Sequence, residues 1–218
     1  VAQRYVPSLF NAESERKKET TVNNNFKISL SLSNTDFIAK MLRIPVNIKM
    51  PGTLTGYIDD SNSKVYINAN IPDLSFNDKK YESITLLLEN PDKELHCHLR
   101  TNIMMKKGAM INVSINGVAD NDVISTKAFW GNNTNVTYSG EVSANAGFSK
   151  DSITGKLHTD INLLPGEVVL NDSVWNIHPA YISIDKDSIE VHDFLFEHKD
   201  QYVKINGRLG KKQSDSCY

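Results

Sequence analysis

The sequence predicts an all-β fold, an antiparallel meander of about a dozen strands with one short helix. Apolar and polar residues alternate with a period of two through most of residues 26–210, and turn-forming residues separate the alternating segments. Because successive side chains of a strand point to opposite faces, each segment has one apolar and one polar face. A twisted sheet of more than ~10 strands rarely stays flat, so this sheet should curl, close or split into packed layers.

The alternating segments place aliphatic and aromatic residues on one face and Lys, Asn, Ser, Glu and His on the other. The segment 188–210, "SIEVHDFLFEHKDQYVKINGRLG", is typical of the whole chain. We expect the apolar face to be lined by Ile28, Leu30, Leu32, Val65, Ile67, Ile84, Leu86, Leu88, Leu95, Leu99, Ile111, Val113, Ile115, Leu157, Ile161, Ile189, Val191, Phe194, Phe196, Val203 and Ile205.

Short polar connectors predict hairpins between these strands. "DDSNS" at 59–63, "ADND" at 119–122 and "DKDS" at 185–188 supply the Asn, Asp and Ser residues that tight turns favour. Strands joined so tightly should pair antiparallel with their neighbours.

One segment has a helical pattern. Asn34 is a candidate N-cap, and Phe37, Ile38, Met41 and Leu42 share one side before Pro45, which predicts a short helix near 35–42. A helix of this kind can cover an open end of a sheet.

The chain divides into a flexible lead-in, residues 1–25, and an elongated β segment, residues 26–218. The lead-in is expected because "NAESERKKETTVNNN" at 11–25 is polar and aperiodic. A break is expected near 164–180, where Pro165, Gly166 and Pro179 interrupt the alternation. The chain begins without Met and ends in a stretch that resembles the start of another strand, which indicates an internal segment of a longer protein.

The bulk composition excludes some function classes. A formal net charge of −2 with 23% charged residues argues against a nucleic-acid binder, which would have a basic excess. No run approaches the ~18 apolar residues of a membrane-spanning helix. Two cysteines, Cys97 and Cys217, do not predict a disulfide, and Cys97 within a strand is best interpreted as a small apolar residue.

Candidate chemical groups are few. His96 and His98 share one strand face, but that face is the polar one and no third metal ligand is evident. The aspartate pairs Asp120/Asp122 and Asp185/Asp187 fit hairpin turns better than a calcium loop, which needs more oxygen ligands at set spacing. The sequence has no nucleophile triad, phosphate loop or dinucleotide fingerprint. We therefore expect no enzyme activity, no cofactor and no metal site.

The C-terminal part of the chain resembles the TamB/AsmA-like family, the translocation and assembly module TamB of the Bacteroidetes type. In that family a Trp and a Pro lead into a strand, a tight turn, a second strand, a "Q-x-hydrophobic-x-hydrophobic-x-G" motif and "DSLY". The corresponding positions here are Trp175, Pro179, the turn 185–188, Gln201, Val203, Ile205, Gly207 and 215–218, with Cys217 where an aliphatic residue is commoner. The helix, "GTLTG" and "LSFNDKKY" near 36–81 are also similar, so the resemblance covers most of residues 26–218.

The resemblance implies an elongated, taco-like groove with an apolar interior, in the periplasmic part of an inner-membrane-anchored protein. It implies phospholipid acyl chains as the ligand, transfer of phospholipid between the inner and outer membranes, support of outer-membrane biogenesis, and an Omp85-type outer-membrane barrel as a candidate partner. No catalytic residue is implied. Two alternatives remain open: a structural β-sandwich without a ligand, and a cell-surface carbohydrate-binding or adhesion module. The adhesion module would need an exposed aromatic platform, for which Trp130 beside "GNNTN" is a candidate.

Overall fold

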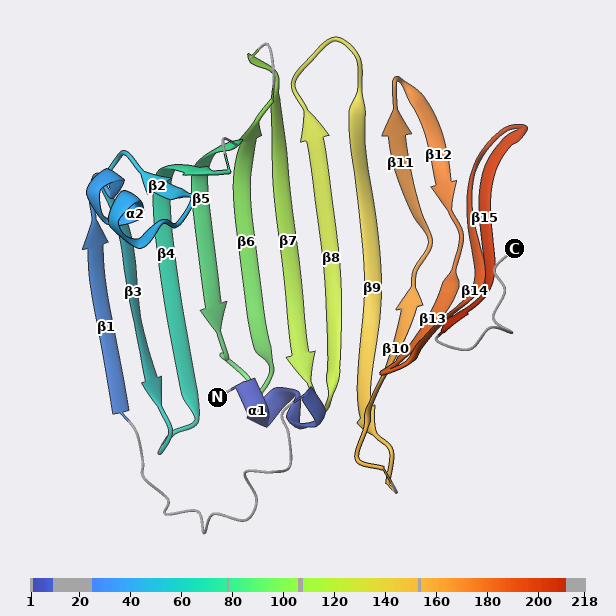
Figure 1. The fold of residues 1–218 in the computed structure, drawn as a ribbon, viewed down its shortest axis with the longest axis horizontal. Coiled ribbons are helices and arrows are strands. Elements are labelled where there is room, and N and C mark those ends of the chain that lie inside the picture. Colours follow the sequence, from blue (N-terminus) through green and yellow to red (C-terminus); the bar gives the residue numbers. More distant parts are fainter. Residues whose placement is uncertain (1, 10–24, 78, 106–107, 153, 211–218) are drawn as a thin grey trace.

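The computed structural model describes residues 2–9, 25–77, 79–105, 108–152 and 154–210. Most of these residues are in strands, as the sequence predicts (Figure 1). The helical elements are α1 (Ala2–Tyr5), η1 (Pro7–Leu9, a 3₁₀ turn) and α2 (Asp36–Leu42). The strands are β1 (Asn25–Leu32), β2 (Val46–Ile48), β3 (Gly52–Asp59), β4 (Lys64–Phe76), β5 (Lys79–Glu89), β6 (Leu95–Met104), β7 (Met110–Asp120), β8 (Val123–Asn132), β9 (Tyr138–Lys150), β10 (Leu157–Leu163), β11 (Gly166–Leu170), β12 (Ser173–Ile177), β13 (Ala180–Asp185), β14 (Ser188–His198) and β15 (Gln201–Gly210).

These fifteen strands form a single sheet in which every pairing is antiparallel. In three places, two short strands lie along the same neighbouring strand and together take up the width of one strand in the sheet. β2 and β3 both lie along β4, β10 and β11 both lie along β9, and β12 and β13 both lie along β14. Fifteen strands less these three leave twelve positions across the sheet, in agreement with the predicted dozen.

The predicted break near 164–180 consists of two interruptions within strands of this sheet. Pro165 separates β10 from β11, and Pro179 lies between β12 and β13. Proline has no N–H for the ladder and so interrupts it. Gly166 permits the close approach after the first break, because a Cβ there would lie 2.7 Å from the Glu141 carbonyl oxygen. The sheet continues across the break, since β11 pairs with β12 and β10 pairs with β13.

Several hairpin turns adopt the backbone conformation that their residues favour. Asn121 and Asp122 have φ of 48° and 61° between β7 and β8, and Asn171 and Asp172 have φ of 52° and 61° between β11 and β12. Two successive positive φ angles define the turn whose twist matches that of the flanking strands, and Asn and Asp tolerate it better than most residues.

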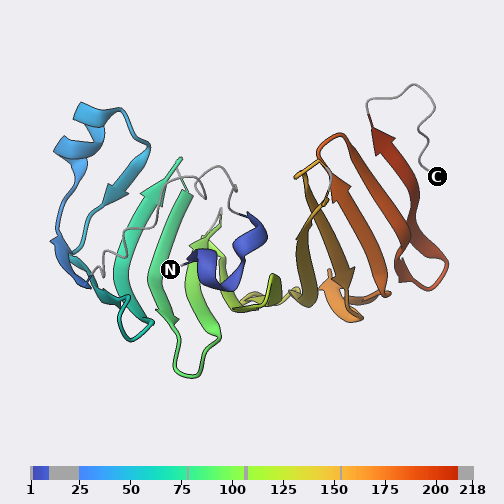
Figure 2. The same ribbon diagram turned by 90° about the horizontal axis from the view of Figure 1, so that it is seen from below.

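The sheet is bent across its width, so that its two ends rise on the same side (Figure 2). We call this side the inner face and the opposite side the outer face. The N-terminal segment, α1 and η1, lies on the inner face at one end of the central strands (Figures 1 and 2). The fold is therefore a curled meander made of one sheet.

Residues 2–9 differ from the flexible lead-in that the sequence predicts. Tyr5 and Val6 are buried, with exposed fractions of 2% and 6%, because they pack on the sheet. Eight residues are too few to show a helical period, and the polar stretch that follows them has no period, so the sequence predicts no ordered element there. Of the predicted lead-in, residues 1 and 10–24 lie outside the described residues, as does Cys217, and Asn25 is the first residue of β1.

Candidate functional site

The strand register aligns the predicted apolar positions on one face. Ala69 pairs with Leu86, Leu86 with Leu99, Leu99 with Ile115, and Ile115 with Ala128, so one row of apolar side chains crosses five strands. Directly opposed residues of paired strands share a face. Near the C-terminus, Ile161 pairs with Ile182 and Ile182 with Val191 in the same way.

This apolar side is the inner face. Tyr5 and Val6, which lie on the inner face, pack against Ala119, Leu95, Ile124 and Phe148. Leu95 pairs with Ala119, and Ala119 with Ile124, which places them in register with the apolar rows.

Most of the inner face is not covered by other protein atoms. Of the twenty-one residues predicted to line it, Val65 alone is buried, and sixteen are half-buried. Leu30, Ile189, Val203 and Ile205 are exposed, with exposed fractions of 43%, 44%, 49% and 38%. Residues of a closed sandwich core would be mostly buried. The described residues contain one sheet and no second layer, so the inner face remains open to solvent.

The N-terminal segment covers one end of the inner face and is held there by hydrogen bonds. The Asn90 side chain, 5% exposed, donates to the Tyr5 hydroxyl at 2.7 Å and to the Ser63 carbonyl at 2.6 Å, and accepts from the Val65 N–H at 2.7 Å. The Asp122 carboxylate accepts from the Ser8 N–H and hydroxyl at 2.7 and 2.9 Å. Asp122 is thus a turn residue that also anchors the N-terminal segment.

The sequence interpretation omitted several inner-face residues. Trp175 lies opposite Val168 and stacks on Phe196 with ring centroids 4.9 Å apart. Ile182 pairs with the predicted lining residues Ile161 and Val191, and Ile184 pairs with Ile189. The alternation of apolar and polar residues in "AYISID" at 180–185 could have identified both isoleucines. Cys97 also lies on the inner face, and partial burial raises the pKa of its thiol.

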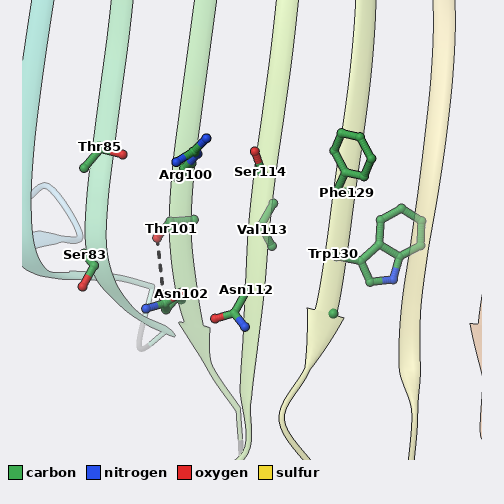
Figure 3. Close-up of a pocket in the computed structure, with 11 residues that line it drawn as sticks. Ser83, Thr85, Arg100, Thr101, Asn102, Asn112, Val113, Ser114, Phe129 and Trp130 are labelled. Carbon is green, nitrogen blue, oxygen red and sulfur yellow. Dashed lines mark hydrogen bonds between the residues drawn. The ribbon is translucent and has the colours of Figure 1, made fainter.

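Two hollows lie side by side on the outer face. The larger, of about 530 Å³, is lined by Thr85, Arg100 and Ser114, which are aligned on β5, β6 and β7, and by Phe129 on β8 (Figure 3). The other, of about 490 Å³, shares Thr85 and Arg100 and extends to β4. The outer face is therefore polar and hollowed around Arg100.

His96 and His98, which the sequence places on the polar face of a strand, also lie on the outer face. The rings of His96 and His98 have centroids 6.4 Å apart, and His98 Nδ1 is 2.9 Å from Asn116 Oδ1. Within the described ranges, no group of three or more His, Cys, Asp or Glu side chains is arranged to hold a metal ion.

The outer face of β10 and β13 carries a hydrogen-bonded charge cluster. His158 Nδ1 lies 2.8 Å from Asp185 Oδ1, and Nε2 lies 2.9 Å from Asp160 Oδ1. The hydrogen bond to Asp185, with the nearby charge of Asp160, raises the pKa of His158. The Tyr181 hydroxyl donates to Asp160, and this bond raises the pKa of Tyr181. The side chains of this cluster hydrogen-bond to one another, so we interpret the cluster as a structural network on the sheet surface.

Comparison of this chain with protein-family models, with curated proteins and with solved structures gave no match. None of the helices in the described ranges has the length and apolar character needed to span a bilayer.

Proposed function

We propose that the inner face binds the acyl chains of phospholipids, and that this chain is a non-enzymatic, periplasmic segment of a cell-envelope protein of the TamB/AsmA-like kind. The observation that carries the proposal is the strand register, which aligns the apolar rows of successive strands on one face that is largely uncovered. That face crosses the sheet from β1 to β15.

The physics of acyl-chain binding fits such a surface. Transfer of each methylene from water to an apolar environment contributes ~0.8 kcal/mol. Half-buried side chains such as Leu86, Leu99 and Ile161 have apolar area left for a ligand to cover. Rows of aliphatic side chains without fixed polar anchors favour no single position of a chain. A bound chain can therefore shift along the face without losing contact, which is what transfer of phospholipid between the two membranes requires.

The proposal is tested by binding of a fluorescent fatty acid to the 218-residue chain. We expect the inner-face double variant Leu99→Gln with Ile115→Asn to bind about tenfold more weakly, because two paired apolar side chains are lost. The matched control is the outer-face pair on the same two strands, His98→Gln with Asn116→Ser, which should bind like the wild type. Equal loss in both variants, or no binding by the wild type, would contradict the proposal.

A carbohydrate-binding or adhesion module is the second candidate, and the outer hollow is the observation that favours it. Arg100 and Phe129 would offer a cation and an aromatic edge to a sugar ligand, with Asn102 and Asn112 beside them. Trp130 instead lies over Gly140 on the inner face and is half-buried. A glycan array that is positive for the wild type and negative for Arg100→Gln would support this second function.

A further inference from the structure

Helix α2 leaves several large apolar side chains in solvent. Among the helix residues whose burial the structure describes, Ala39 is buried, with 8% of its surface exposed. Phe37, Met41 and Leu42 are exposed by 76%, 64% and 56%, and Ile44 just after the helix by 45%. We call Phe37, Met41, Leu42 and Ile44 the α2 apolar patch. These four side chains therefore do not cover the sheet.

The exposure of the α2 apolar patch is not a consequence of a loosely attached helix. The Thr35 N–H donates to the Ile48 carbonyl at 3.0 Å, and the Ile48 N–H donates to the Thr35 hydroxyl at 2.8 Å. Arg43 closes the helix in the left-handed conformation, with its N–H donating to the Lys40 carbonyl at 3.3 Å. The N-terminal end of α2 is thus tied to β2, its C-terminal end is closed by its own backbone, and the side chains of the patch are exposed.

The charged residues that follow Phe37, in and just after α2, are all basic. Lys40, Arg43 and Lys49 are exposed, and no acidic residue occurs between Phe37 and Met50, although the whole chain has a net charge of −2. The nearest acid in sequence, Asp36, accepts a hydrogen bond from the Asn47 side chain. An apolar patch flanked by three exposed cations is complementary to an anionic surface.

We propose that the α2 apolar patch docks on an anionic lipid bilayer, with Phe37 and Met41 inserted among the lipids and Lys40, Arg43 and Lys49 at the headgroup phosphates. Exposed aromatic and aliphatic residues flanked by Lys and Arg are what interfacial membrane binding requires. This inference does not depend on the acyl-chain proposal.

The position of α2 determines at which end of the strands a docked bilayer would lie. α2 lies at one end of the strands, and α1 lies at the other (Figure 1). A bilayer held at α2 would therefore lie at the end of the strands that the N-terminal segment does not cover.

Vesicle co-sedimentation tests the inference, with vesicles of phosphatidylcholine alone and of phosphatidylcholine mixed with phosphatidylglycerol. We expect binding to the mixed vesicles, weakened by salt, and a loss of about tenfold or more in Phe37→Glu with Met41→Glu. Replacing the three cations by Lys40→Gln, Arg43→Asn and Lys49→Gln should also weaken binding. The matched control is Tyr202→Glu, at a side chain that is 68% exposed on β15, which should bind like the wild type.

A second readout locates the contact. A tryptophan introduced by Phe37→Trp should be quenched by brominated lipids, whereas one introduced by Tyr202→Trp should not. No vesicle binding by the wild type, or equal loss in the Tyr202→Glu control, would overturn the inference. Dimerisation in sedimentation velocity that Phe37→Glu abolishes, without vesicle binding, would show that a second copy covers the patch. Fatty-acid binding is measured without vesicles, so its outcome is independent of these results.

Discussion

The indole of Trp130 lies over Gly140, the residue directly opposite it on the neighbouring strand β9. A Cβ at Gly140 would lie 2.8 Å from Trp130 Cη2, closer than carbon atoms approach in real structures. The glycine therefore leaves room for a large aromatic side chain to lie flat on the inner face. On its other side, Gly140 pairs with Val168 of β11.

Gly140→Ala should destabilise the fold by about 1–3 kcal/mol, because the added methyl group forces the indole out of its position. The free energy of unfolding from urea denaturation measures this effect. In a Trp130→Leu background the same substitution should be nearly neutral, which makes the pair a double-mutant cycle. Gly131→Ala is the control, since its Cβ would meet Ser139 Cβ at an ordinary 3.7 Å. Equal effects at both glycines would contradict the packing described.

Leu99→Ala should cost only about 1 kcal/mol of stability if the inner face is open, since the half-buried side chain has less contact to lose. In a closed sandwich core the same truncation typically costs about 2–5 kcal/mol. Urea denaturation of the ligand-free chain distinguishes the two. A loss in the higher range would show that other protein atoms cover this face.

Tyr5→Phe should lower the free energy of unfolding by about 1–3 kcal/mol, because the buried Asn90 amide loses its hydrogen-bond acceptor at the Tyr5 hydroxyl. The substitution should also speed hydrogen exchange at the Asp122 amide, which donates to the Tyr5 carbonyl at 2.9 Å. Tyr57→Phe, at a side chain 41% exposed, should change stability by less than about 0.5 kcal/mol. A Tyr5→Phe variant as stable as Tyr57→Phe would mean that the N-terminal segment is not docked.

His158 should make the stability of the sheet depend on pH. Its folded-state pKa is raised above the ordinary value of 6.5, chiefly by the hydrogen bond to Asp185. Protonated His158 therefore contributes fully to the free energy of unfolding below pH 6.5, and this contribution is lost as the pH rises through the raised pKa. The difference in unfolding free energy between the wild type and His158→Gln should shrink over that interval. Asp185→Asn should move the pKa of His158, measured by NMR, back toward its ordinary value, and a difference that grows with pH would contradict this account.

The sequence was sufficient to predict features that depend on local patterns. Alternation such as that of Leu95, Cys97 and Leu99 predicted the strands and their faces, and Pro45 correctly marked the region where the short helix ends. The pair Asn121–Asp122 predicted a tight hairpin, because few other residues tolerate two successive positive φ angles.

Features that depend on distant contacts were not predictable in the same way. The N-terminal residue Tyr5 is ordered by Asn90, eighty-five positions away, and nothing in eight residues indicates such a partner. The apolar residues of α2 suit a helix that covers an open end of the sheet, but Phe37, Met41 and Leu42 are exposed. Alternation assigns Ile161 to a face without saying whether a second layer covers that face, which is why alternation alone does not separate a groove from a sandwich.

Photocrosslinking from adjacent leucines tests the central claim most directly. Leu86 and Leu87 are neighbours on β5 and both half-buried, but Leu86 belongs to the inner face and Leu87 to the outer face. A photoreactive residue at Leu86, in the chain expressed in the envelope of a diderm bacterium, should yield adducts with the mass of a phospholipid, and one at Leu87 should not. The absence of lipid adducts at Leu86, or equal yields from the two positions, would contradict an acyl-chain-binding inner face.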